Sequence, residues 1–106
     1  MQTLRELLTA KLKLIPGIEE HQLPQHPGFT FFEYNGKGIG HFDTDFEFDL
    51  KLKKINIAAE GLEHPRDSTN HPNRHRTKPH WIVFPFNSKK EVNNIVRLVK
   101  VAIGQA

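Results

Sequence analysis

The sequence contains no cysteine, which excludes a disulfide framework, a thiolate nucleophile and a cysteine-based zinc site. It has no apolar run of transmembrane length. Charged residues interrupt the N-terminal segment where a signal peptide needs an apolar core; they are Arg5, Glu6, Lys11 and Lys13. We therefore expect a cytoplasmic protein without a membrane partner, and 106 residues predict one domain over 1–106.

Several catalytic motifs are also missing. The chain has no G-x-S-x-G, no P-loop and no dinucleotide-binding fingerprint. Serine occurs only at Ser68 and Ser88, and Ser88 is better placed as a helix cap, so we do not expect a serine nucleophile. The net charge of +3 is mild, whereas seven histidines are many for this length. Imidazole is therefore the side chain on which a functional hypothesis can rest.

Asn35-Gly36 is the strongest turn signal, because a two-residue type I′ turn needs positive φ at both positions and these residues tolerate it. It predicts a hairpin in which Tyr34 pairs with Lys37. A second turn falls at 43–45, and alternating apolar and charged residues over 46–53 predict a half-buried strand after it.

The register of the second turn decides where His41 points, since a shift of one residue turns every side chain to the other face. A two-residue loop at 44–45 pairs His41 with Phe48 and places the imidazole on an apolar face. A three-residue loop instead places His41 beside Glu47 and Asp49. We favour the first register, because the apolar residues of both hairpins then share one face.

Helical patterns flank these strands. Residues 3–6 fit a capping box before a leucine stripe, and residues 88–91 fit a second capping box before the C-terminal stripe. Residues 17–28 resemble a connector, 53–62 a short helix and 80–86 a fourth strand. We predict an α+β fold with an antiparallel sheet of about four strands. The N- and C-terminal helices pack on one face, and one short helix lies between strands three and four.

Residues 63–79, which read EHPRDSTNHPNRHRTKP, are too polar to form a core, so we predict a surface loop that is either functional or disordered. Its histidines raise a metal hypothesis, in which His41 and Asp43 are joined by His71 or His75. These residues have no recognised ligand spacing, so we predict no metal.

Basic residues of this loop, together with a lysine cluster at 51–54, raise a nucleic-acid hypothesis; they are Arg66, Arg74, Arg76, Lys78, Lys51, Lys53 and Lys54. Acidic residues lie among them and the net charge is low. We therefore expect a solvated basic surface and no nucleic-acid partner.

Three stretches of the chain are, in order, GKGIGHFDTDFEFDLKL, AAEGLEHP and HWIVFPFNSKKEVNNIVRLVKVAIG. Together they resemble the luciferase-domain family, which groups fungal bioluminescence luciferases with small bacterial proteins. The similarity runs from about Pro27 to Gly104. The resemblance implies, for the fungal members, membrane-anchored enzymes that oxidise a hydroxylated pyrone with dioxygen and use neither a metal nor an organic cofactor. Residues 1–106 contain no match to their N-terminal membrane region, so we expect a protein closer to the bacterial members, whose function is not established. We therefore expect no cofactor.

The residues that carry this resemblance include the histidine already singled out. The family's Ile-x-His-x-His strand is matched as far as His41, and Asp43 stands where the family has its second histidine. Trp81 matches a strand that begins with tryptophan. The family's His-Pro dipeptide is matched by either His64-Pro65 or His71-Pro72.

We therefore predict a pocket for a small aromatic or polar ligand between the sheet and the 63–79 segment. Imidazole exchanges protons near neutral pH, so this pocket could support acid–base chemistry or a cofactor-independent oxidation. The predicted catalytic residues are His41, Asp43 and His71. The predicted ligand contacts are His64, His75, Arg74 and Trp81.

A second hypothesis comes from another class of function, a non-catalytic interaction module. It would bind protein or nucleic acid through the 63–79 segment and through a second apolar face formed by Phe29, Phe31 and Phe42. The same apolar face could instead pair two copies of the chain, so a homodimer is a further hypothesis.

Overall fold

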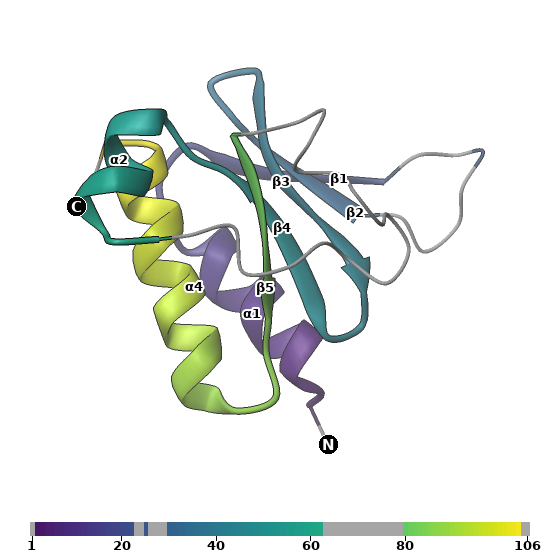
Figure 1. Ribbon diagram of the computed structural model, residues 1–106. Helices are drawn as coiled ribbons and strands as arrows, with labels where there is room; N and C mark the ends of the chain where they lie inside the picture. The colour runs from purple at the N-terminus through teal and green to yellow at the C-terminus, as the bar shows by residue number, and fades with distance from the viewer. Residues whose placement is uncertain (1, 23–24, 26–29, 63–79, 105–106) are drawn as a thin grey trace.

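The computed structural model describes residues 2–22, 25, 30–62 and 80–104 (Figure 1). Five strands form one antiparallel sheet in the order β1-β2-β3-β4-β5. They are β1 (Ile18–Gln22), β2 (Thr30–Tyr34), β3 (Lys37–Thr44), β4 (Glu47–Lys51) and β5 (Trp81–Pro85).

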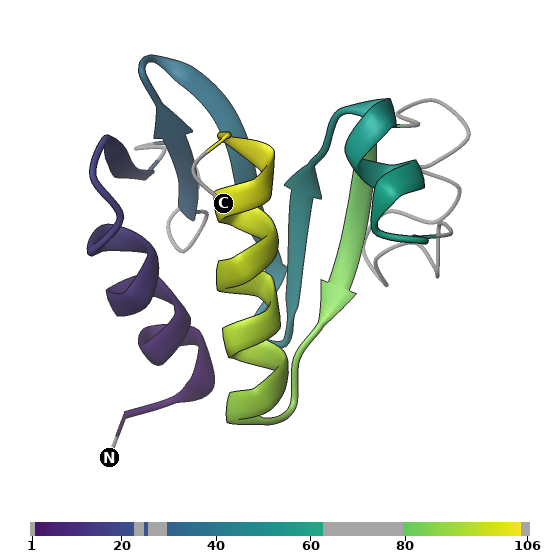
Figure 2. The ribbon, with the colours of Figure 1, turned by 90° about the vertical axis from the view of Figure 1, so that its left-hand side faces the viewer.

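Two longer helices pack together against one face of this sheet, as Figure 2 shows. They are α1 (Leu4–Lys13) and α4 (Lys89–Ala102), and the predicted α+β architecture is confirmed to this extent. The short helix α2 (Lys54–Ala59) lies between β4 and β5, within the predicted range. None of the helices in the described part of the chain has the length and apolar character that a bilayer crossing requires.

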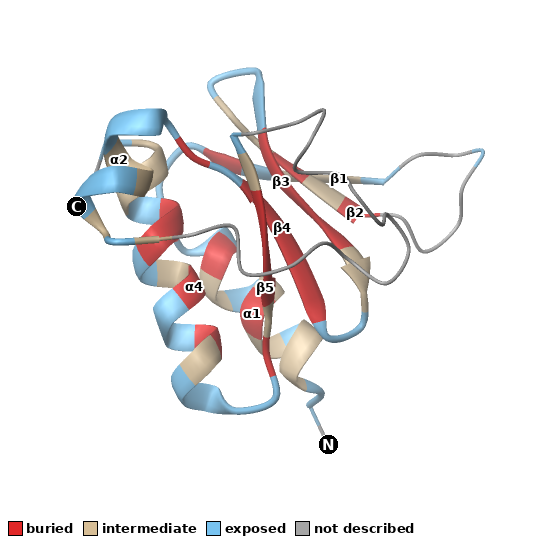
Figure 3. Ribbon diagram, in the orientation of Figure 1, coloured by how far each residue is buried: buried red, intermediate tan, exposed pale blue. Residues whose placement is uncertain are grey.

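The core lies between the two long helices and the sheet (Figure 3). Its aromatic centre is a cluster of phenylalanines in which the ring centroids of Phe42 and Phe48 are 5.2 Å apart and those of Phe32 and Phe48 are 5.9 Å apart. The helices contribute aliphatic residues that are almost fully buried; they are Leu8, Leu12, Val92, Ile95, Leu98 and Val99. Burial of each such side chain stabilises the fold by about 1.5–3 kcal/mol.

The strand count differs from the prediction, because β1 lies in the segment that was assigned to a connector. This strand pairs antiparallel with β2 from Ile18↔Tyr34 to Gln22↔Thr30. It has a single apolar residue, Ile18, so its side chains give no alternating pattern. Backbone pairing at the sheet edge, and not periodicity, therefore defines β1.

The first hairpin is confirmed at its turn. Asn35 and Gly36 have φ values of 52° and 80°, and Tyr34 pairs with Lys37. Farther along, a bulge shifts the register, so that Phe32 lies opposite Gly40. A regular hairpin would have paired Phe32 with residue 39.

The register favoured for the second turn is wrong. Thr44 pairs with Glu47, and a second bulge between residues 42 and 44 places His41 opposite Asp49. Phe42 then points into the core with the helices, whereas Phe46 lies in the turn and is 56% exposed. The favoured register would have put an imidazole in that apolar layer, and burying a polar group there is costly.

Phe42 is therefore not part of a second apolar face with Phe31, as the interaction-module hypothesis assumed. Phe29 and the 63–79 segment of that hypothesis lie outside the described residues.

Candidate functional site

The sheet face opposite the helices carries a row of side chains that crosses all five strands. The register aligns His21 with Phe31, Phe31 with His41, His41 with Asp49 and Asp49 with Val83. Residues aligned in this way point to the same face and touch their neighbours. His41 sits at the centre of the row, on the middle strand β3.

His41 is buried, with 8% of its surface exposed, and it faces two carboxylates. Its Nε2 lies 2.9 Å from Oδ1 of Asp43 and 3.5 Å from Oδ2 of Asp49. Asp49 comes from the paired strand β4, whereas Asp43 lies at the bulge in β3. The bulge is thus the local distortion that brings Asp43 to the imidazole, a role that bulges often have beside functional sites.

A third carboxylate lies on the same face. Glu47 is two residues before Asp49 on β4 and is 4% exposed, while Asp49 is completely buried. Removing a carboxylate from water costs several kcal/mol unless compensating charges and hydrogen bonds surround it. The acidic groups and the imidazole buried together on this face therefore form the candidate functional site.

Trp81 provides the aromatic wall of the cluster. It lies on β5 opposite Lys51, two residues from Val83, and therefore on the same face as the row that contains His41. The ring centroids of His41 and Trp81 are 5.3 Å apart and the rings are tilted by 47°. The indole is an apolar surface against which a planar ligand could stack. The imidazole, the two carboxylates of Asp43 and Asp49 and this indole are called the His41 cluster below.

A second imidazole on the same face has a related but more exposed environment. His21 stacks on Phe31 with ring centroids 5.3 Å apart, and its Nε2 lies 3.0 Å from Oε1 of Glu33 and 3.3 Å from Oε2 of Glu19. Its side chain is 38% exposed, compared with 10% for His41.

Both groups have donor atoms that could hold a metal ion. In the His41 cluster, and in the set of Glu19, His21 and Glu33, the three donor atoms all lie within 4.8 Å of one another. In both, the atoms approach at ion-pair distance without the alignment of a hydrogen bond. Ligands about 2.0–2.2 Å from one ion lie roughly 3–3.5 Å apart, and the distances from Nε2 of His41 to the two carboxylates, 2.9 Å and 3.5 Å, are close to this spacing for a divalent cation such as Zn²⁺.

Three of the predicted site residues are brought together, namely His41, Asp43 and Trp81. The other four lie outside the described residues; they are His64, His71, Arg74 and His75. The favoured interpretation missed Asp49 and Glu47. The signal that could have found them was the alternative register, which placed both beside His41.

A scan against models of protein families, a search of curated proteins and a search of solved structures each found no match. The resemblance to the luciferase-domain family therefore stays a prediction, and the function has to be argued from the geometry of the His41 cluster.

Proposed function

We propose that this chain is a cytoplasmic, luciferase-like domain that binds a small aromatic or polar ligand at the His41 cluster. The observation that carries the proposal is the position of the imidazole. Its Nε2 is 2.9 Å and 3.5 Å from two buried carboxylates, and its ring is 5.3 Å from the indole of Trp81. A site of this kind combines an apolar wall with a few polar groups that orient the ligand.

His41 would act as the acid–base group of the site. It would take a proton from a hydroxyl group of the ligand, and the carboxylates of Asp43 and Asp49 would stabilise the imidazolium that forms. A carboxylate that faces an imidazole also fixes the orientation of the ring. Deprotonation of an enol or phenol makes the ligand electron-rich, and a cofactor-independent oxidation would need this step before any reaction with dioxygen.

The test uses Trp81 as the reporter, because it is the only tryptophan in the chain. We expect a saturable change in its fluorescence when the protein is titrated with 4-hydroxy-6-methyl-2-pyrone or 4-hydroxybenzoate. His41→Gln removes the imidazole and should weaken this binding by about tenfold or more, the usual effect of losing a hydrogen bond to a charged group.

The matched control is His21→Gln, which removes an imidazole from the same face without touching Trp81. It should bind the ligands like the wild type. Circular dichroism and thermal melting show whether each variant is folded, and His41→Asn provides a second variant of different length. If wild type and His41→Gln give the same titration curve, or if neither probe changes the fluorescence of the wild type, the proposed function is wrong.

A bound divalent cation is a second candidate, and the spacing of the three donor atoms favours it. It is distinguished by repeating the titration after treatment with EDTA and again after adding Zn²⁺. An acid–base role predicts the same ligand response in all three conditions. If the response disappears with EDTA and returns with Zn²⁺, then His41 is a metal ligand.

A further inference from the structure

The sheet opens between its third and fourth strands at the end nearest α2. β3 and β4 pair from Thr44↔Glu47 only as far as Gly40↔Leu50, and no further pair joins them within the described residues. Their outer neighbours continue, because β2 pairs with β3 as far as Lys37 and β4 pairs with β5 as far as Lys51. Figure 2 shows the β2–β3 hairpin and the β4–β5 pair diverging toward this end.

The divergence creates a pocket of about 430 Å³. Its apolar lining comes from Ile39 on β3, Leu52 just after β4 and Ala102 at the end of α4. A volume of this size is within the range of sites that hold small organic molecules.

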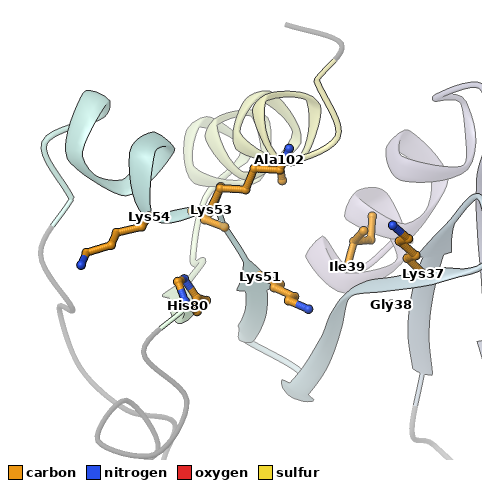
Figure 4. A pocket seen from close by; sticks show the side chains of 9 residues that line it. Lys37, Gly38, Ile39, Lys51, Lys53, Lys54, His80 and Ala102 are labelled. Carbon is orange, nitrogen blue, oxygen red and sulfur yellow. The ribbon is translucent and has the colours of Figure 1, made fainter.

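The polar lining of the pocket is basic. Lys37 comes from β3, Lys51 from β4, and Lys53, Lys54 and His80 from the segments that follow β4 and precede β5. In Figure 4, Lys51 extends from β4 toward β3, whereas Lys54 points away from the opening. No acidic residue lines the pocket in the part of the chain that the structure describes.

Among the described residues, these ammonium groups have no ion-pair partner. Within residues 2–22, 25, 30–62 and 80–104, no carboxylate lies within 4.0 Å of the Nζ of Lys37, Lys51, Lys53 or Lys54. The lysines therefore repel one another across the opening, and an anion placed between them would replace repulsion by attraction.

We propose that this pocket binds an organic anion that has a carboxylate or phosphate head and an apolar body. Lys37, Lys51, Lys53 and His80 would hold the head, since ammonium groups bind such anions as point charges. Ile39, Leu52 and Ala102 would bury the body. None of the lining residues belongs to the His41 cluster, so this site stands whether or not that cluster binds a ligand.

The geometry favours a compact anion over a polynucleotide. Phosphate tracking requires cations spread along a groove, whereas these lysines surround one opening with an apolar floor. The net charge of +3 is also small for a protein that binds a polynucleotide, so it favours a compact anion as well.

The experiment compares probes that share one body. 2-Naphthoate, 2-naphthyl phosphate and the neutral 2-naphthamide are titrated into the whole ¹⁵N-labelled protein, and the backbone amide shifts of Gly38 and Leu52 are followed. We expect saturable shifts with at least one of the anions and binding at least about tenfold weaker for the amide. The tighter of the two anions identifies the head group. Shifts confined to His41 and Trp81 would report the other site and would count against this one.

Variants test whether the pocket lysines, and not the general charge of the protein, bind the head. Lys51→Gln/Lys53→Gln should weaken binding about tenfold, whereas the control Lys89→Gln/Lys90→Gln, which makes the same charge change at the start of α4, should stay within about twofold. These lysines are exposed, so we expect every variant to fold. Equal loss in both pairs, equal binding of anion and amide, or binding of a single-stranded oligonucleotide with no response to the small anions would each overturn the proposal.

Discussion

Two glycines on β3 have different structural roles although they are only two residues apart. A Cβ added at Gly40 would lie 2.7 Å from the ring of Phe48 and 2.9 Å from the carbonyl oxygen of Asp49, whereas a Cβ at Gly38 would meet nothing within 4 Å. Phe48 is completely buried in the core, so its ring has no space into which to withdraw. Of these two positions, only residue 40 must be glycine, because there the backbone of β3 lies against the ring of Phe48.

We expect Gly40→Ala to lower the free energy of unfolding by about 1–3 kcal/mol, as overpacking of a core usually does. Gly38→Ala is the matched control. It should leave stability unchanged or raise it by up to about 1 kcal/mol, because alanine restricts the unfolded chain. Urea unfolding of both variants measures the difference, and equal stability of the two would show that the contact with Phe48 is not what excludes a side chain.

At the scale of single residues, the sequence predicted part of the His41 cluster. His41, Asp43 and Trp81 could be singled out, because an imidazole in a strand and a lone tryptophan are visible in any register. The favoured register left Asp49 out of the cluster and the alternative register placed it there, since the side on which Asp49 lies depends on whether a bulge occurs at residue 43. That bulge follows from packing of Phe42 and Phe48 in the same layer, which is a tertiary effect.

At the scale of elements, α1 begins with a complete capping box. The Thr3 hydroxyl accepts from the Glu6 backbone N–H at 3.1 Å, and the Thr3 backbone N–H donates to Oε1 of Glu6 at 2.9 Å. We expect Thr3→Ala to destabilise the protein by about 1 kcal/mol. Thr9→Ala, a change of the same kind inside the helix, should be neutral or slightly stabilising because alanine is the better helix former.

The capping box also predicts a dependence on pH. Hydrogen bonds from the backbone and then the side chain of Thr3 hold the pKa of Glu6 below its usual value of 4.5. The ionised carboxylate therefore contributes stability above about that pH, and the contribution is lost as the pH falls through the lower pKa of the folded state. Glu6→Gln should melt below the wild type at pH 7, and the difference should shrink as the solution is acidified. A constant difference across this range would contradict the assignment.

The elements differed in how well the sequence predicted them. The capping box of α1 and the Asn35-Gly36 turn depend on local chemistry, and the structure has both. At α4 only half of the predicted capping box forms: the Ser88 hydroxyl accepts from the Glu91 backbone N–H, whereas the Glu91 carboxylate accepts from the backbone N–H of Asn87. β1 has no local signal, because its residues are mostly polar and its pairing partner lies in β2. The two bulges were not predicted either, because each inserts an extra residue that the alternation of side chains in the sequence does not mark.

At the scale of the whole molecule, the two faces of the sheet differ in composition. The face under α1 and α4 carries the apolar core, while the opposite face carries the acidic groups and imidazoles. The order of helix and strand patterns was enough to predict this layered α+β arrangement, because each amphipathic element must bury one face. The sequence patterns did not predict which polar residues meet on the second face, because that depends on the relative register of several strands.

Arg5 of α1 joins the first helix to the sheet and allows the docking of these layers to be tested. Its guanidinium lies 4.5 Å from the centroid of the Phe42 ring, and its Nη1 is 3.0 Å from Oδ1 of Asp45. The Arg5 side chain is 24% exposed and that of Asp45 is 76% exposed. The ion pair is therefore well solvated, and exposed pairs of this kind contribute about 0–1 kcal/mol.

We expect the contact with Phe42 to dominate, because an arginine that covers an aromatic ring also loses packing when it is truncated. Arg5→Ala should lower the free energy of unfolding by about 1–2 kcal/mol, whereas Asp45→Asn should change it by less than about 0.5 kcal/mol. Urea unfolding of both variants in low and high salt provides the measurement. The effect of Arg5→Ala should persist in salt, since screening weakens exposed ion pairs more than contacts that are partly buried. If Asp45→Asn is as destabilising as Arg5→Ala and the loss disappears in salt, the ion pair and not the aromatic contact holds α1 to the sheet.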